Sequence, residues 1–177
     1  MCSSDLLLSP YHKILQISAF CIENNTSFDS FVDPKQSVFK LSTKCHNIND
    51  NDVHKKDTID IVITKLLSYL QLDKFEKVVF IAHNCYNFDQ VILLKECAPF
   101  FKNKCVLFWD TLPWLRNNIK YVFKHSNKLS KYQTVCKFNL GHLYKCFYKK
   151  DLENAHRADA DVRALSSIYT DFIRPFI

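Results

Sequence analysis

Apolar residues alternate with polar ones in two runs near the start of the chain. The runs are 13–22 (KILQISAFCI) and 27–33 (SFDSFVD), and a polar ENNT lies between them. Alternation with a period of two is typical of half-buried strands, and a short polar connection favours a hairpin. The pattern therefore predicts two antiparallel strands, the second of which ends at Pro34.

A helical period follows a loop rich in Asn and Asp around CHNINDND. From Asp57 to Leu72, apolar residues recur at intervals of three and four, which predicts an amphipathic helix. The apolar stripe consists of Ile59, Val62, Ile63, Leu66, Leu67 and Leu70.

Two short runs that are almost wholly apolar, 77–83 (KVVFIAH) and 105–111 (CVLFWDT), are typical of strands covered on both faces. Between them NFDQVILLKEC predicts a helix with Asn87 as its N-cap. A mostly helical C-terminal half follows. This order of elements predicts an α/β fold, one domain over 1–177, with a mixed central sheet and helices on both faces.

Composition limits the class of protein. The chain has 177 residues, of which 47% are hydrophobic and 24% charged, enough for one core. No apolar run approaches the roughly 20 residues of a membrane span, so we expect no membrane partner. The start has no secretory pattern and the eight cysteines form no C-x-x-C pair. We therefore expect free thiols and an intracellular protein, in the cytoplasm or nucleus.

The net charge of +6 is unevenly distributed. Between Thr111 and Lys150 there are nine basic residues and no acidic ones, which leaves 15 basic and 18 acidic residues elsewhere. A segregated positive field favours a polyanion, and rings beside it could stack on unpaired bases. A lysine-rich face kept for solubility is the alternative. The basic residues are Arg116, Lys120, Lys124, Lys128, Lys131, Lys137, Lys145, Lys149 and Lys150, and the rings are Tyr121, Tyr132, Phe147 and Tyr148.

Two acidic residues lie on helix faces that should be buried. Asp161 precedes apolar residues of the last predicted helix by three, four and seven positions, and Asp89 precedes two by three and four. These apolar residues are Ala164, Leu165, Ile168, Ile92 and Leu93. Burying an ionised carboxylate is unfavourable unless a cation or hydrogen bonds compensate. Two inward carboxylates near strand ends therefore predict one site.

His156 lies in the loop before the last helix, five residues ahead of Asp161. A histidine titrates near neutrality and could take a proton from water. The segment therefore indicates one wall of a metal-dependent hydrolytic site, and the structural alternative is a capping histidine beside a solvent-edge aspartate.

Four segments form an ordered set. HNCYNFD matches H-N-G-x-x-[FY]-D, and HRADAD matches H-x-A-x-x-D. FWDTLPWL is similar to a D-T-L segment, and FNLGHLYKCFY is similar to S-L-x-x-L-Y. From about Ser9 to Phe172, the chain resembles the DEDDh (DnaQ-like, RNase H-like fold) 3′-to-5′ exonucleases, and most of all the animal three-prime repair exonucleases.

The resemblance implies two-metal hydrolysis of phosphodiesters, with two Mg²⁺ or Mn²⁺ ions at the scissile phosphate. By this resemblance Asp161 would ligate a metal, Asp89 would hold metal-bound water or the second ion, and His156 would be the general base. His83 and Asn84 would lie near the terminal nucleotide.

The resemblance also implies partners. DNA or RNA 3′ ends, single-stranded, would be bound with the help of basic residues, for which we expect Lys120, Lys124 and Lys128. The family relatives are often dimers, so a homodimer is a further expectation.

The first family motif, D-x-E, is missing. In MCSSDLLLSP its positions fall on Cys2 and Ser4, or, with a three-residue gap, on Asp5 and Leu7. Without the bridging carboxylate the main electrostatic reason for two cations to gather is lost, so we expect impaired catalysis. The first strand is truncated and would have to form from residues 2–8.

Three hypotheses stay open at this point. The chain is an impaired exonuclease, a pseudo-exonuclease kept as a nucleic-acid binding module, or an interaction domain. The missing motif itself was lost, or it was cut off by the gene model. In the second motif Cys85 replaces a glycine, at a position where a positive φ is expected.

Overall fold

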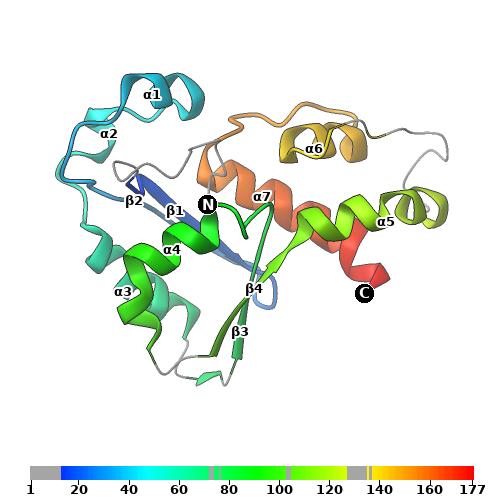
Figure 1. Cartoon of the computed structure of the whole chain (residues 1–177), viewed down its shortest axis with the longest axis horizontal. Helices are drawn as coiled ribbons and strands as arrows, with labels where there is room; N and C mark the ends of the chain where they lie inside the picture. Colours follow the sequence, from blue (N-terminus) through cyan, green and yellow to red (C-terminus); the bar gives the residue numbers. More distant parts are fainter. Residues whose placement is uncertain (1–12, 72–73, 76, 103–104, 127–134, 136) are drawn as a thin grey trace.

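The computed structural model describes residues 13–71, 74–75, 77–102, 105–126, 135 and 137–177 (Figure 1). Strands and helices alternate through the first two thirds, and helices make up the last third. The order is β1 (Gln16–Cys21), β2 (Thr26–Phe31), α1 (Lys40–His46), α2 (Asp50–Val53), α3 (Ile59–Leu70), β3 (Lys77–Ala82), α4 (Asp89–Cys97), η2 (Ala98–Phe101), β4 (Cys105–Asp110), α5 (Thr111–His125), α6 (Leu140–Tyr148), α7 (Ala158–Ile168), η3 (Tyr169–Ile173) and η4 (Arg174–Phe176).

The predicted hairpin is confirmed. β1 and β2 pair antiparallel, with Gln16 opposite Phe31 and Cys21 opposite Thr26. Asn25 closes the turn with a φ of 56°, a left-handed conformation that Asn tolerates better than most residues. One more backbone bond, from Val32 N to the Leu15 carbonyl, continues the pairing beyond the strands.

The two central strands are also confirmed. β3 and β4 pair in parallel, from Lys77 opposite Cys105 to Ala82 opposite Asp110. The described strands thus pair in both senses, as the mixed α/β fold class requires, but they form two separate pairs. The truncated first strand expected at 2–8 lies outside the described residues.

Helices α3 and α4 cover one side of the strands. The stripe predicted on α3 is buried as expected, since Val62, Ile63 and Leu66 are at most 2% exposed. They pack with Ile17 of β1 and Leu93 of α4 in one apolar cluster. Burial of this stripe stabilises α3 more than its intrinsic helix propensity does.

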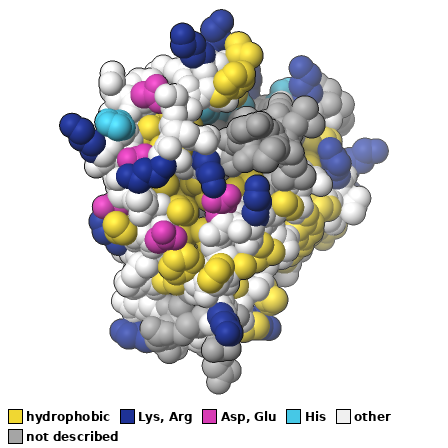
Figure 2. All heavy atoms as spheres, turned by 60° about the vertical axis from the view of Figure 1, so that its left-hand side comes forward, with side chains coloured by type: hydrophobic (Ala, Val, Ile, Leu, Met, Phe, Trp, Pro, Cys, Tyr) yellow, Lys and Arg dark blue, Asp and Glu magenta, His cyan; other side chains and the backbone are white. Residues whose placement is uncertain are grey.

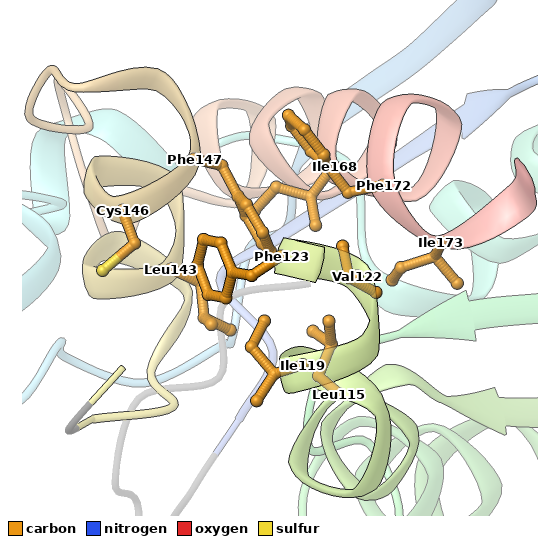
Figure 3. Packing of buried hydrophobic residues seen from close by; sticks show 10 residues of the cluster. All are labelled: Leu115, Ile119, Val122, Phe123, Leu143, Cys146, Phe147, Ile168, Phe172 and Ile173. Atoms are coloured by element: carbon orange, nitrogen blue, oxygen red, sulfur yellow. The ribbon is translucent and has the colours of Figure 1, made fainter. Parts of the chain in front are cut away.

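A second cluster joins α5, α6, α7 and η3, and Figure 3 shows the side chains that these elements contribute to it. Phe147 of α6 stacks on Phe172 of η3 with ring centroids 4.4 Å apart and an interplanar angle of 10°. The strands therefore have helices on both sides, α3 and α4 on one and α7 on the other (Figure 1).

Helices α1 and α2 correct the expectation of a plain loop around CHNINDND. A capping box starts α2, because Asn51 N donates to the Asn49 side chain and Asn49 N donates to Asp52 Oδ2. Polar residues that indicate a loop are therefore the capping groups of a very short helix.

Other expectations concern cysteines and membranes. The six cysteines within the described ranges are free thiols, as predicted. In the same ranges, none of the helices has the length and apolar character needed to cross a bilayer.

Candidate active site

Asp89 is the first residue of α4 and lies just beyond the end of β3. Its side chain is buried, at 4% exposed. The Oδ2 atom is buried and has no hydrogen-bond partner among the described residues. A buried carboxylate oxygen without a partner is costly, so binding of a cation or a proton at this atom would be favourable.

The electrostatic surroundings of Asp89 favour its protonated form. Burial is the largest cause, and the negative charges of Asp110 and Asp161 add to it, so that the pKa of Asp89 rises to about 6. The charges of two further carboxylates therefore act on Asp89, and the shared site predicted for Asp89 and Asp161 stays a prediction.

Asp161 lies in the first turn of α7 and is 9% exposed. The apolar residues predicted to share its face, Ala164, Leu165 and Ile168, are buried with it. Its Oδ1 accepts a hydrogen bond of 3.3 Å from the backbone N of His156. The inward direction of both carboxylates is therefore confirmed.

His156 lies in the turn before α7, is exposed, and has a φ of 71°. Its ring lies near the buried His46 of α1, because positive charge on His156 and Arg157 contributes, after burial, to a lowered pKa of His46. His46 Nδ1 accepts from Ile48 N at 3.1 Å. The ring of His156 is exposed and its backbone N–H is bonded to Asp161, and its role as a general base stays a prediction.

Asp110 is a site residue that sequence reasoning missed. It ends β4, is 4% exposed, and caps α5 through a 2.9 Å bond from Leu112 N. It also accepts from Asn84 N at 2.7 Å and from Tyr86 N at 3.2 Å. The available signal was an aspartate between an apolar strand and a helix, which is a preferred N-cap position.

The loop between β3 and α4 corrects two expectations. The positive φ belongs to Asn84, at 62°, and the fully buried Cys85 has an ordinary negative φ. Asn87 is not the N-cap of α4, because Phe88 holds that position without a capping side chain among the described residues. The Asn87 side chain instead donates to Asn84 Oδ1 at 2.9 Å.

His83 is buried, and both of its ring nitrogens have protein partners. Nδ1 lies 2.9 Å from Thr111 Oγ1, and Nε2 lies 2.6 Å from the Phe138 carbonyl oxygen. Burial lowers the pKa of His83. The neutral ring therefore joins the end of β3 to α5 and to the segment before α6, and a contact with a nucleotide stays a prediction.

Basic residues form an exposed stripe on α5. Arg116, Lys120 and Lys124 recur every four residues and are exposed, and Tyr121 beside them is 53% exposed. The predicted Lys128 lies outside the described residues. By contrast, Figure 2 shows basic and acidic side chains intermixed over the face toward the viewer.

The aromatic rings expected beside these charges differ in their exposure to solvent. Phe147 was wrongly expected to stack on bases, because it is 4% exposed and belongs to the core. Tyr148 is partly buried, and its hydroxyl donates to Asp171 Oδ2 at 2.8 Å. Tyr132 lies outside the described residues. Tyr121 is therefore the ring in this set that the structure shows exposed.

The residues present fit a cation at Asp89, because its buried Oδ2 has no hydrogen-bond partner among the described residues and the negative charge of Asp161 acts on the same carboxyl group. Within the described residues, no group of three or more His, Cys, Asp or Glu side chains could hold a metal ion. The first-motif positions Cys2, Ser4, Asp5 and Leu7 lie outside that part of the chain. The candidate cation ligands among the described residues are thus Asp89 and Asp161.

Strands of both senses between helices, with buried carboxylates at the strand ends, define an α/β protein of the RNase H-like class. A family model described as Exonuclease, the RNase T family, matches residues 4–169. The chain therefore belongs to this exonuclease family. The closer likeness to the animal three-prime repair exonucleases stays a prediction.

One curated relative is the PolC-type DNA polymerase III of Clostridium perfringens (strain 13 / Type A). It is 30% identical over 159 residues, which cover 88% of this chain and 10% of that protein. The chain thus spans only a small part of this relative's length.

Three solved structures share the fold. Cell-death related nuclease 4 has a TM-score of 0.67 at 16% identity, covering 93% of this chain and 57% of its own. A full-length 3′-exonuclease has a TM-score of 0.62 at 13% identity, with 98% and 57% covered. Exonuclease I of E. coli, in complex with a dA16 oligonucleotide, has a TM-score of 0.59 at 18% identity, with 84% and 34% covered.

Proposed function

We propose that this chain binds single-stranded 3′ ends of DNA or RNA and hydrolyses the terminal phosphodiester slowly, in the 3′-to-5′ direction. The observation that carries the proposal is the buried Oδ2 of Asp89, which has no hydrogen-bond partner among the described residues and feels the charge of Asp161. Membership of the exonuclease family supports it.

Asp89 and Asp161 would hold the divalent cation, Mg²⁺ or Mn²⁺. When bound, such a cation polarises the phosphoryl oxygens and lowers the pKa of water. Asp89 needs the cation most, because its buried charge is otherwise opposed by burial and by two neighbouring carboxylates.

The chain's own residues hold this pair in place. The carboxylate of Asp110 fixes the loop that leads to Asp89 by accepting backbone N–H bonds from Asn84 and Tyr86. Asp161 accepts a hydrogen bond from the backbone N–H of His156. In this proposal the imidazole would lie at the entrance of the site. His156 would accept the proton of the attacking water as the P–O3′ bond breaks and a 5′-nucleotide leaves.

The basic stripe on α5 would contact the phosphate backbone. Arg116, Lys120 and Lys124 run along α5, the helix that Asp110 caps, so the stripe leads away from the site. Contacts of this kind carry no sequence information and weaken as salt screens them. The exposed ring of Tyr121 offers a surface on which one base could stack.

Binding without hydrolysis is the second candidate, and one observation favours it. The described residues supply two neighbouring carboxylates and no group of three metal-ligating side chains. A second cation would need oxygens beyond these, such as those the D-x-E motif supplies in the resembled family, and its positions here read Cys2 and Ser4, or Asp5 and Leu7.

Hydrolysis of a 3′-labelled single strand, with Mg²⁺ or Mn²⁺ and with chelator, separates the two candidates. We expect slow, cation-dependent release of nucleotides that Asp161→Ala and His156→Ala abolish. Asp60→Ala, which removes an exposed carboxylate of α3, is the matched control. Salt-dependent binding with no release would support the binding module. The absence of both binding and release would refute both candidates.

A further inference from the structure

The first turn of α7 carries both a candidate metal ligand and the backbone that leads to His156, so its placement decides the geometry of the site. A helix start leaves backbone N–H groups without partners. The N-cap position of α7 is held by Arg157, whose side chain makes no capping hydrogen bond and, as a guanidinium, has no acceptor to offer. The partner for the start of α7 must therefore come from elsewhere.

That partner is Gln16 of β1. Its Oε1 accepts from Ala158 N, the first residue of α7, at 3.1 Å, across 142 positions of sequence. Its Nε2 donates to Asp159 Oδ1 at 3.3 Å and to Asp29 Oδ1 at 2.9 Å. Gln16 is 7% exposed, so its amide is buried with its acceptor and both amide hydrogens in use.

A second contact joins the β1–β2 hairpin to the start of α7. Phe31 is opposite Gln16 in the register of the hairpin. The guanidinium carbon of Arg157 lies 5.5 Å from the centroid of the Phe31 ring, and Arg157 Nε lies 3.6 Å from Asp159 Oδ1. One cross-strand pair of the hairpin thus contacts the first turn of α7 through two different side chains.

We propose that Gln16 is a positioning residue that caps α7 from the hairpin and thereby fixes Asp161 and His156 relative to Asp89. The inference rests on the proposed function for its catalytic meaning, whereas the capping itself does not depend on activity. Gln16 does not touch the reacting atoms. It acts through the backbone of Ala158 and the carboxylate of Asp159.

The decisive variant is Gln16→Leu, which keeps the bulk and removes the three bonds. Ser18→Ala is the matched control, because Ser18 lies on the same strand and its hydroxyl donates to the same Asp29 rather than to α7. Gln16→Glu is the second variant, since it keeps an acceptor for Ala158 N and loses both donors. It also remains informative should the leucine variant not fold.

The first readout is backbone hydrogen exchange, which needs no activity. In Gln16→Leu we expect the amides of the first turn of α7 to exchange about ten-fold faster or more, with the last turn unchanged. The His156 ring resonances should differ in position between Gln16→Leu and the wild type. Gln16→Glu should show an intermediate effect, and adding Asp159→Asn to it should restore protection, because the introduced amide can donate to the glutamate. Ser18→Ala should match the wild type.

The second readout is kinetic. With Mn²⁺ and a single-stranded oligonucleotide, kcat of Gln16→Leu should fall by about ten- to a hundred-fold while KM changes little. Unchanged exchange at the start of α7, or a fall in kcat that Ser18→Ala reproduces, would overturn the inference. If the wild-type protein releases no nucleotide, the hydrolysis in the proposed function is refuted. The capping by Gln16 is then tested by hydrogen exchange and by the His156 resonances, which do not depend on activity.

Discussion

Replacing Asp89 with asparagine tests the electrostatics of the site most directly. The pKa of Asp89 is raised from 3.8 to about 6, chiefly by burial. A raised carboxyl pKa means that the folded state binds the proton more tightly than the unfolded state does. The charged side chain therefore destabilises the fold, with a penalty that is absent well below pH 3.8, grows between pH 3.8 and about 6, and is constant above that.

The magnitude follows from the pKa difference. At about 1.4 kcal/mol for each tenfold change in proton affinity, the full penalty is about 3 kcal/mol above pH 7. Near pH 4.5 the penalty is about 1 kcal/mol, because the unfolded state is by then mostly ionised and the folded state is still largely protonated. The asparagine side chain cannot ionise, so the free energy of unfolding of Asp89→Asn, relative to wild type, should rise by about 2 kcal/mol between about pH 4.5 and about pH 8.

The assay is urea unfolding of both proteins at several pH values with a chelator present. Taking the difference between the two proteins at each pH cancels the titration of groups that do not interact with Asp89. The fixed cost of the unpaired asparagine amide drops out when these differences are compared between pH values. Adding Mn²⁺ should then stabilise the wild type more than Asp89→Asn. A difference in free energy that stays flat with pH, or that falls as the pH rises, would refute the argument about burial.

Three further outcomes are expected. Asp110→Ala should lower the free energy of unfolding by about 2–4 kcal/mol, since three backbone N–H groups lose their acceptor, with Asp110→Asn between it and wild type in urea unfolding. His83 should titrate below 6.5 by NMR. Because its folded pKa is lowered, the stability it confers is complete above 6.5 and declines as the pH falls, and His83→Gln should remove that decline. Gln71→Gly should raise the melting temperature, with a gain of about 0.5–1 kcal/mol, because Gln71 ends α3 at a φ of 49°, and a lower melting temperature would contradict this.

Local periodicity was enough to predict much of the fold. The strands at 16–21, 26–31, 77–82 and 105–110 and the helix α3 follow patterns that depend on neighbours only. The inward direction of Asp161 follows from the same rule, since a stripe of buried residues fixes the face of every member.

Contacts between distant segments could not be predicted. Asp110 binds backbone groups 24 and 26 positions away, and Gln16 binds one 142 positions away, so neither spacing nor composition indicates them. The cap of α4 was predicted wrongly for a related reason. Asn87 has the right chemistry for a cap, but its side chain bonds to Asn84 instead, and such competition between local partners is invisible in a pattern.

The left-handed corners of the chain have a consequence for the loops around the site. Nine residues in the described ranges have a positive φ, four of them Asn, and none is a glycine. A side chain at a positive φ confines the backbone to a small left-handed region of φ/ψ space. Glycine at the same position could also adopt several other φ/ψ regions. Asn84, five residues before Asp89, and His156, five residues before Asp161, are two of these residues. Both loops should therefore keep the same backbone conformation with and without a ligand. Ligand binding should then require little loop closure.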